Sequence, residues 1–314
     1  MTVPPRPDSS DKSDSSDTSG TPHLDPGDGL TEEVVTLTDG RRIRTVTAGE
    51  ASGPCVAFEA GMGASAAAWT HIQRDVATRV RTVSYDRANI GGSADDRSPR
   101  SLERIVDDLA EVVDQVAGNA PVILVGHSWG GPIVRLFAHL NPERIAGMVL
   151  VDATASAILS PAVAALNAGS MRLGSLLIRA GQGDRFTRTL LPDGASPLIT
   201  EADLALFWRD SLTQRAMRMA LNEERHVTSS IALMRMLERE GGPDVPGVVL
   251  QGGRQRGLLE RRMRSRQNAA ATTIVDAMPQ GRLVVLDDAG HLITHERPDA
   301  VIDAVDDVLS PTRR

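Results

Sequence analysis

Residues 126–130 read Gly126-His127-Ser128-Trp129-Gly130, and they follow the apolar run Val122-Ile123-Leu124-Val125. A G-x-S-x-G pattern after a short apolar run is typical of a sharp turn between a buried strand and a helix. Such a turn holds the serine backbone in a strained conformation, and its glycines let other segments pass close by. The pentapeptide alone also fits an ordinary Gly/Ser loop. The apolar segment 133–140 after it favours the strand–turn–helix.

Short apolar runs on both sides of this turn predict the rest of a sheet. Two strand-like segments flank Asp39-Gly40, which indicates a hairpin. Further strands are expected at 56–59, 80–85, 148–151, 248–250 and 283–286, and helices at 102–116, 131–140 and 300–309. A hairpin followed by alternating strands and helices predicts an α/β fold. Its sheet is expected to be mostly parallel and doubly wound, with helices on both faces.

Composition divides the chain into three parts. Residues 1–29 consist largely of Ser, Asp, Pro, Gly and Thr, which predicts a disordered tail. Residues 30–153 and 245–310 carry the alternating pattern and are expected to form one core. Residues 154–244 break that pattern, and we expect them to form an inserted helical cap. Its helices are predicted at 157–166, 171–178, 201–209 and 212–237.

The overall composition excludes several classes of protein. A chain of 314 residues with 41% hydrophobic content can bury one large core. The net charge of −7 argues against a nucleic-acid partner, and the basic cluster at 254–266 is interpreted as a solvated helix face. The single cysteine, Cys55, permits no intramolecular disulfide, and no Cys/His cluster has the spacing of a zinc site.

The distribution of apolar residues also predicts where the protein is located. No apolar stretch approaches the roughly 18 residues of a membrane span, and the N-terminus has no signal-like apolar region. We therefore expect a cytoplasmic protein that acts on a small molecule without a membrane partner. The oligomeric state cannot be predicted from the sequence.

A serine hydroxyl is a weak nucleophile at neutral pH and needs a base within hydrogen-bond reach. His291 lies just after the last predicted strand, where a loop at the carboxyl edge of the sheet would bring it over the turn. His127, inside the turn, is expected to have a structural role. His295 lies one helical turn beyond His291 and is expected on the surface.

Four segments together resemble the α/β-hydrolase superfamily, and the resemblance extends from Glu33 to Leu309. They are Phe58-Glu59-Ala60-Gly61-Met62-Gly63, Tyr85-Asp86-Arg87-Ala88-Asn89-Ile90-Gly91-Gly92-Ser93, the segment from Gly126 to Gly131, and Ala289-Gly290-His291. In this order they are specific for the fold and much less specific for a substrate.

The resemblance implies an oxyanion hole and no metal or organic cofactor. Its donors would be the backbone N–H groups of Met62 and Trp129. An ordinary turn also fits the glycines around Met62. Asp86 and Arg87 belong to a segment that is chiefly structural in this superfamily, and we expect these two side chains to pair with each other.

In this superfamily a carboxylate orients the histidine base and completes a Ser-His-acid triad. The position of this acid is where the sequence departs from the common pattern. Most relatives carry it in a Gly-x-x-Asp loop after the strand at 248–250, but Gly252-Gly253-Arg254-Gln255 contains no carboxylate. Some members, certain lipases among them, place the acid one strand earlier, where Asp152 closes the strand 148–151. Asp152 is therefore the candidate acid, although a helix N-cap or a loop-bracing residue also fits it. Glu260 is a weaker rival.

These residues predict a serine hydrolase that cleaves a small, largely apolar ester through an acyl-enzyme. Serine at position 128 disfavours haloalkane dehalogenase and epoxide hydrolase chemistry, which the superfamily performs with an aspartate there. One alternative is an aminopeptidase related to proline iminopeptidases, in which Glu223 and Glu224 would hold a substrate amine, although a plain surface pair also fits them. Another is a non-catalytic ligand-binding or receptor protein on the same scaffold. With only 3% aromatic residues in the chain, the pocket is expected to be aliphatic, lined by Met, Leu and Ile, with Trp69, Trp129 and Trp208 as candidate aromatic members.

Overall fold

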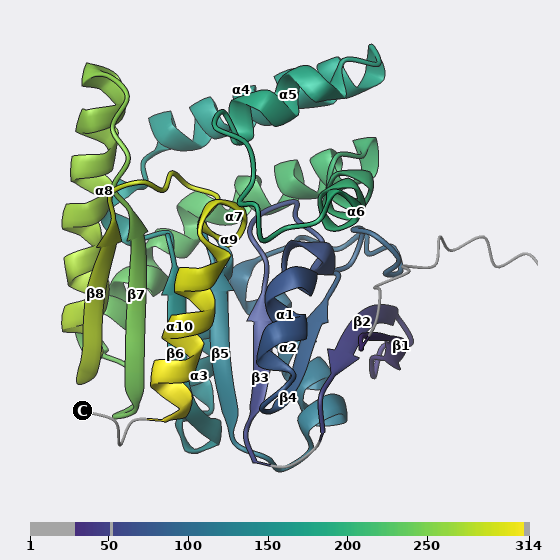
Figure 1. Cartoon of the computed structure of the whole chain (residues 1–314), viewed down its shortest axis with the longest axis vertical. Helices are drawn as coiled ribbons and strands as arrows, with labels where there is room; N and C mark the ends of the chain where they lie inside the picture. The colour runs from purple at the N-terminus through teal and green to yellow at the C-terminus, as the bar shows by residue number, and fades with distance from the viewer. Residues whose placement is uncertain (1–28, 51–52, 311–314) are drawn as a thin grey trace, which may run out of the picture.

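The computed structural model describes residues 29–50 and 53–310, so the predicted tail at 1–29 lies, apart from Gly29, outside the described residues. An eight-stranded sheet with the order β1-β2-β4-β3-β5-β6-β7-β8 forms its centre (Figure 1). The strands are β1 (Thr31–Thr36), β2 (Arg42–Ala48), β3 (Cys55–Glu59), β4 (Arg81–Tyr85), β5 (Val122–His127), β6 (Ile145–Val151), β7 (Pro246–Gly252) and β8 (Gln280–Leu286). β1 and β2 form the predicted hairpin, β2 pairs antiparallel with β4, and the remaining pairs are parallel.

Helices cover both faces of this sheet, and the side chains of β5 show why. Val122 and Leu124 pack into one apolar cluster with α2 (Leu102–Ala117), α3 (Gly130–Leu140) and α8 (Leu258–Asp276). Ile123 and Val125 point to the opposite face and pack with α1 (Thr70–Val76) and α10 (Pro298–Leu309). A run such as 122–125, which is apolar at every position, is buried on both faces, as a parallel sheet between two helical layers requires. The predicted α/β class is confirmed.

The remaining long helices lie largely above the carboxyl ends of the parallel strands, and the last of them ends against α3 on one face of the sheet (Figure 1). They are α4 (Pro161–Arg179), α5 (Gly183–Leu190), α6 (Glu201–Ser211) and α7 (Gln214–Glu240), and the short α9 (Ile293–Glu296) follows the loop after β8. The sequence predicts two helices where α4 is continuous. The Ser160 side chain caps α4 and Pro161 begins it. A mid-helix glycine such as Gly169 costs only about 1 kcal/mol, which tertiary packing overrides.

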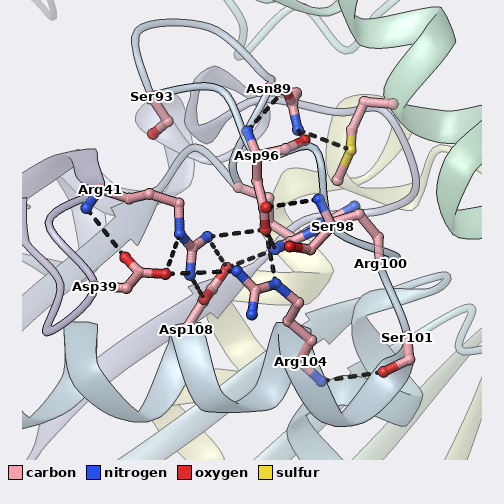
Figure 2. Close-up of polar contacts among 12 residues, drawn as sticks. Asp39, Arg41, Asn89, Ser93, Asp96, Ser98, Arg100, Ser101, Arg104 and Asp108 are labelled. Carbon is pink, nitrogen blue, oxygen red and sulfur yellow. Dashed lines mark hydrogen bonds and ion pairs between the residues drawn. The ribbon is translucent and has the colours of Figure 1, made fainter.

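An ion-pair network braces the long loop between β4 and α2 (Figure 2). Asp108 of α2 accepts two hydrogen bonds from Arg41 of the β1–β2 hairpin, at 2.9 and 2.5 Å, and one from Arg100 at 2.8 Å. Asp96 of the loop accepts from Arg100 at 3.0 Å and from Arg104 at 2.7 Å. Arg100 and Asp108 are both almost completely buried. The network therefore fixes the hairpin and the loop onto α2.

Candidate active site

The turn after β5 holds Ser128 in the strained conformation that its sequence predicts. Ser128 has φ of 53°, in the left-handed region that side chains other than glycine rarely adopt. Its backbone N–H donates to the Val151 carbonyl at 3.0 Å, and its carbonyl accepts from the Thr154 N–H at 3.0 Å. These bonds fasten the turn to the end of β6.

Close backbone approaches explain both flanking glycines. A Cβ on Gly130 would lie 2.4 Å from the Glu59 carbonyl oxygen, and a Cβ on Gly126 would lie 2.7 Å from the Gly130 oxygen. Both distances are shorter than real Cβ contacts allow, so only glycine fits at either position.

The structure brings Ser128, His291 and Asp152 together in one chain of hydrogen bonds. The Nε2 atom of His291 lies 3.1 Å from Ser128 Oγ, and its Nδ1 atom lies 2.6 Å from Asp152 Oδ2. With the proton on Nδ1, the imidazole donates to the carboxylate and leaves Nε2 free to accept the serine proton. The ring of His291 is about half exposed, whereas Asp152 is buried.

Asp152 is held by more than His291. Its Oδ1 accepts from the Gly252 backbone N–H at 3.0 Å, and Nη1 of Arg264 lies 2.8 Å from each carboxylate oxygen. Burial alone would raise the pKa of the Asp152 carboxyl, but its bonds to His291 and Arg264 outweigh burial and lower this pKa to about 2. The carboxylate is therefore ionised at neutral pH. Arg264 was expected among solvated arginines, and this interpretation is wrong, because Arg264 is buried.

The loop after β3 lies against the serine turn. A Cβ on Gly61 would lie 3.3 Å from Ser128 Cβ, and both Met62 and Trp129 line the same cavity as Ser128. Arg87 donates to the Ala60 and Gly61 carbonyls at 2.7 and 2.8 Å. Because a trans peptide points its N–H opposite to its carbonyl, the Met62 N–H faces away from Arg87.

The predicted pair between Asp86 and Arg87 does not form. Asp86 pairs with Arg44 at 2.8 Å, while Arg87 pairs with Glu59 at 2.6 Å and with Glu223 of α7 at 2.7 Å. Successive residues leaving a strand point in opposite directions, so each finds its own partners. The Arg87 group is fully buried and joins β3 to α7. Glu223, expected as a possible surface residue, is buried in this ion pair.

Two further histidines lie beside the triad. His127 Nε2 is 2.9 Å from the His291 backbone carbonyl, which supports its predicted structural role. Burial, with the nearby His291 ring, lowers the pKa of His127 to about 4. The expectation that His295 lies on the surface is wrong. It is 1% exposed, and its ring lies between those of His71 and Phe207, with centroids 5.2 and 4.3 Å away.

A cavity of about 310 Å³ opens onto Ser128 and His291. The chain has four phenylalanines and three tryptophans, and Phe186, Phe207, Trp129 and Trp208 all line this cavity. Trp129 and Trp208 were expected as candidate lining residues, whereas Phe186 and Phe207 were not, so the pocket is more aromatic than the sequence predicts. Met62, Met171, Met217 and several Leu side chains complete its apolar walls. One charged side chain, Glu224 of α7, lies among the described residues that line it.

Parts of the chain are similar in sequence to known proteins. The chain is 34% identical to the YqjL protein of Bacillus subtilis over 121 residues, which are 38% of this chain and 47% of that protein. It is 33% identical to epoxide hydrolase B of Mycobacterium tuberculosis over 100 residues, 31% of this chain and 28% of that enzyme. The matches thus span less than half the length of these curated relatives.

The Cif epoxide hydrolase of Acinetobacter nosocomialis has a similar fold, with a TM-score of 0.71 at 18% identity over 90% of each chain. Within residues 29–50 and 53–310, no helix is both long and apolar enough to cross a membrane. The family model described as the alpha/beta hydrolase family matches residues 57–304. With this match, the eight-stranded sheet and the serine turn in agreement, the chain belongs to the alpha/beta hydrolase family.

Proposed function

We propose that this hydrolase cleaves a small, largely apolar ester or related acyl compound through an acyl-enzyme on Ser128. The observation that carries the proposal is the hydrogen-bonded series Ser128 Oγ, His291 Nε2, His291 Nδ1 and Asp152 Oδ2, with distances of 3.1 and 2.6 Å. A serine, a base and an orienting carboxylate in this geometry are the groups that nucleophilic acyl transfer needs.

In the proposed reaction, Ser128 Oγ attacks the scissile carbonyl while His291 Nε2 takes its proton. The Asp152 carboxylate holds the ring and stabilises the imidazolium. The Met62 and Trp129 backbone N–H groups bind the oxyanion, and each such donor contributes about 3 kcal/mol to transition-state stabilisation. His291 then protonates the leaving alcohol. A water, deprotonated by His291, releases the acid and restores Ser128.

The residue at the turn separates this proposal from epoxide opening and dehalogenation. Those reactions need a carboxylate nucleophile in this superfamily, and position 128 is a serine. The similarity to the Cif epoxide hydrolase is a similarity of fold, because 18% sequence identity does not indicate a shared substrate. The apolar cavity walls support an acyl or alkyl group as the part of the substrate that binds there.

A fluorophosphonate probe combined with a panel of acyl esters tests the proposal. We expect the probe to label Ser128, the protein to hydrolyse short and medium acyl esters, and Ser128→Ala to lose both properties while keeping its melting temperature. Faster cleavage of proline amides than of esters would replace this proposal with the aminopeptidase alternative. Folded protein that neither reacts with the probe nor cleaves any ester would favour the non-catalytic binding protein.

A further inference from the structure

The carboxyl of Glu224 occupies the cavity wall without a counter-charge. Glu224 is 5% exposed, and its Oε1 atom is buried with no hydrogen-bond partner among the described residues. Its neighbour Glu223 is also buried, but the carboxylate of Glu223 is fully paired. Both Glu223 oxygens bind the Arg87 guanidinium, at 2.7 and 2.9 Å.

The position of Glu224 on α7 aims it at the substrate space. Met217, Ala220, Glu224 and Val227 follow each other at helical spacing and all line the cavity. An apolar residue would fill this face without a desolvation cost, whereas a buried carboxyl oxygen without a partner destabilises the fold. Asn167 of α4 lines the cavity as well. Burial raises the pKa of Glu224 to about 7, against hydrogen bonding with Asn167, which lowers it.

No arginine or lysine belongs to the described cavity lining. A substrate carboxylate would therefore meet Glu224 without a compensating cation. A hydrogen-bond donor on the substrate, in contrast, would satisfy the oxygen that the protein leaves unpaired.

We propose that Glu224 and Asn167 form a polar subsite that selects acyl compounds carrying an O–H or N–H donor besides the scissile function. This proposal rests on the proposed hydrolase function and names its substrate class as hydroxy- or amino-substituted esters. The apolar walls bind the chain of such a substrate, and Glu224 accepts the hydrogen bond from its hydroxyl or ammonium group. A site built to bond such a group discriminates strongly against the analogue that lacks it.

Matched esters test the subsite. Each series contains three esters of the same chain length, which end in a methyl, a hydroxyl or an ammonium group. Series of several chain lengths are prepared, and kcat/KM is measured for every ester. For the best length we expect the wild type to prefer a donor-ended ester at least tenfold over the methyl-ended one. Glu224→Leu should reverse this preference by accelerating the methyl-ended ester and slowing the donor-ended ones. Glu224→Gln separates the two donors, because it keeps an acceptor oxygen and so retains the preference for hydroxyl, but not that for ammonium.

Glu240→Leu is the matched control, since Glu240 ends the same helix with its side chain 56% exposed. It should leave the preference as it is in the wild type. Glu224→Leu should also raise the melting temperature, because it removes a buried carboxyl oxygen that has no hydrogen-bond partner among the described residues. If wild type and Glu224→Leu hydrolyse all the esters with the same preference, the subsite is overturned and the hydrolase proposal stands.

A binding measurement separates the two proposals if no ester is cleaved. Non-hydrolysable amide analogues of the same series are titrated into Ser128→Ala by calorimetry. Tighter binding of the donor-ended analogue, lost in Ser128→Ala with Glu224→Leu, supports the subsite even without turnover. Equal binding of all analogues overturns it.

Discussion

Arg264 of α8 donates from Nη1 to both carboxylate oxygens of Asp152, each at 2.8 Å. The carboxylate that contacts His291 is therefore shared with a buried cation from a helix more than 100 residues further along the chain. This ion pair fixes the orientation of the Asp152 side chain and also lowers the pKa of its carboxyl. The two effects can be separated by experiment.

Arg264→Met should lower kcat by roughly 10- to 100-fold, because a displaced carboxylate no longer orients the base. KM should change little, since Arg264 is not part of the cavity lining. Because the Arg264 charge lowers the pKa of the Asp152 carboxyl, removing that charge should raise this pKa, and the acid limb of the kcat/KM profile should move to higher pH. Arg264→Lys should restore part of the rate. Arg262→Met, an exposed position on the same helix, is the control, and an unchanged rate and pH profile in Arg264→Met would refute the positioning role.

Asp152→Asn tests the proposed acid directly. We expect kcat to fall about 10³- to 10⁴-fold, because an amide neither holds the correct tautomer nor stabilises the imidazolium. Circular dichroism should show an intact fold, since the amide oxygen can still accept from the Gly252 N–H. Turnover near that of the wild type would remove Asp152 from the triad.

Gly130→Ala should destabilise the protein by several kcal/mol or prevent its folding, because the new Cβ would lie 2.4 Å from the Glu59 carbonyl oxygen. Gly169→Ala in α4 is the matched control. A Cβ there meets nothing within 4 Å, so alanine should stabilise the helix by about 0.5–1 kcal/mol. Urea unfolding of both variants measures the difference, and equal stabilities would contradict the packing argument.

The buried His127 should make stability fall as the pH is lowered. Its pKa is about 4 in the folded state, below the ordinary value of 6.5. The unfolded chain therefore binds more protons between these two values, and stability is lost as pH falls through this window. The loss from this group should reach about 2 kcal/mol at pH 5.

His127→Gln keeps a donor for the His291 carbonyl and removes the titration. Urea unfolding at pH 7 and pH 5 should show a smaller difference for this variant than for the wild type. Part of the dependence should remain, because burial also lowers the pKa of His71 and His295. The same pH dependence in both proteins would contradict this assignment.

Asp108→Ala should cost about 3–5 kcal/mol of stability, because it leaves Arg100 buried beside an incomplete set of partners (Figure 2). Asp107→Ala, on the exposed side of the same helix, should change stability by less than about 0.5 kcal/mol. Thermal unfolding compares them. Similar melting temperatures would show that Arg41 and Arg100 find other partners.

The sequence predicted the fold and the residues that meet at the serine turn because both are encoded locally. Ser128, Asp152 and His291 each follow a recognisable apolar strand, and the carboxyl ends of parallel strands converge at one edge. Arg264 and Glu224 carry no such signal. Arg264 has arginine neighbours at 261, 262 and 266, and only the packing of α8 decides which of the four is buried.

The acidic pair on α7 and the aromatic residues depend on packing in the same way. Glu223 and Glu224 are adjacent and chemically identical, yet they differ by about 100° around α7, so one meets Arg87 and the other the cavity. Composition could not reveal that Phe186 and Phe207 would line the same cavity as Trp129 and Trp208.

The Arg87 guanidinium binds Glu223 and also the carbonyls of Ala60 and Gly61. If α7 swung away from the sheet, it would leave a buried cation and a buried carboxylate without each other, at a cost of several kcal/mol. The same movement would leave Arg87, which holds the loop before Met62, with only one of its two carboxylate partners. We therefore expect α7 to remain a fixed wall during turnover. The substrate's route in and the product's route out should open on the side of α4, which packs on α7, and α5, which packs on α4, since both helices are largely exposed.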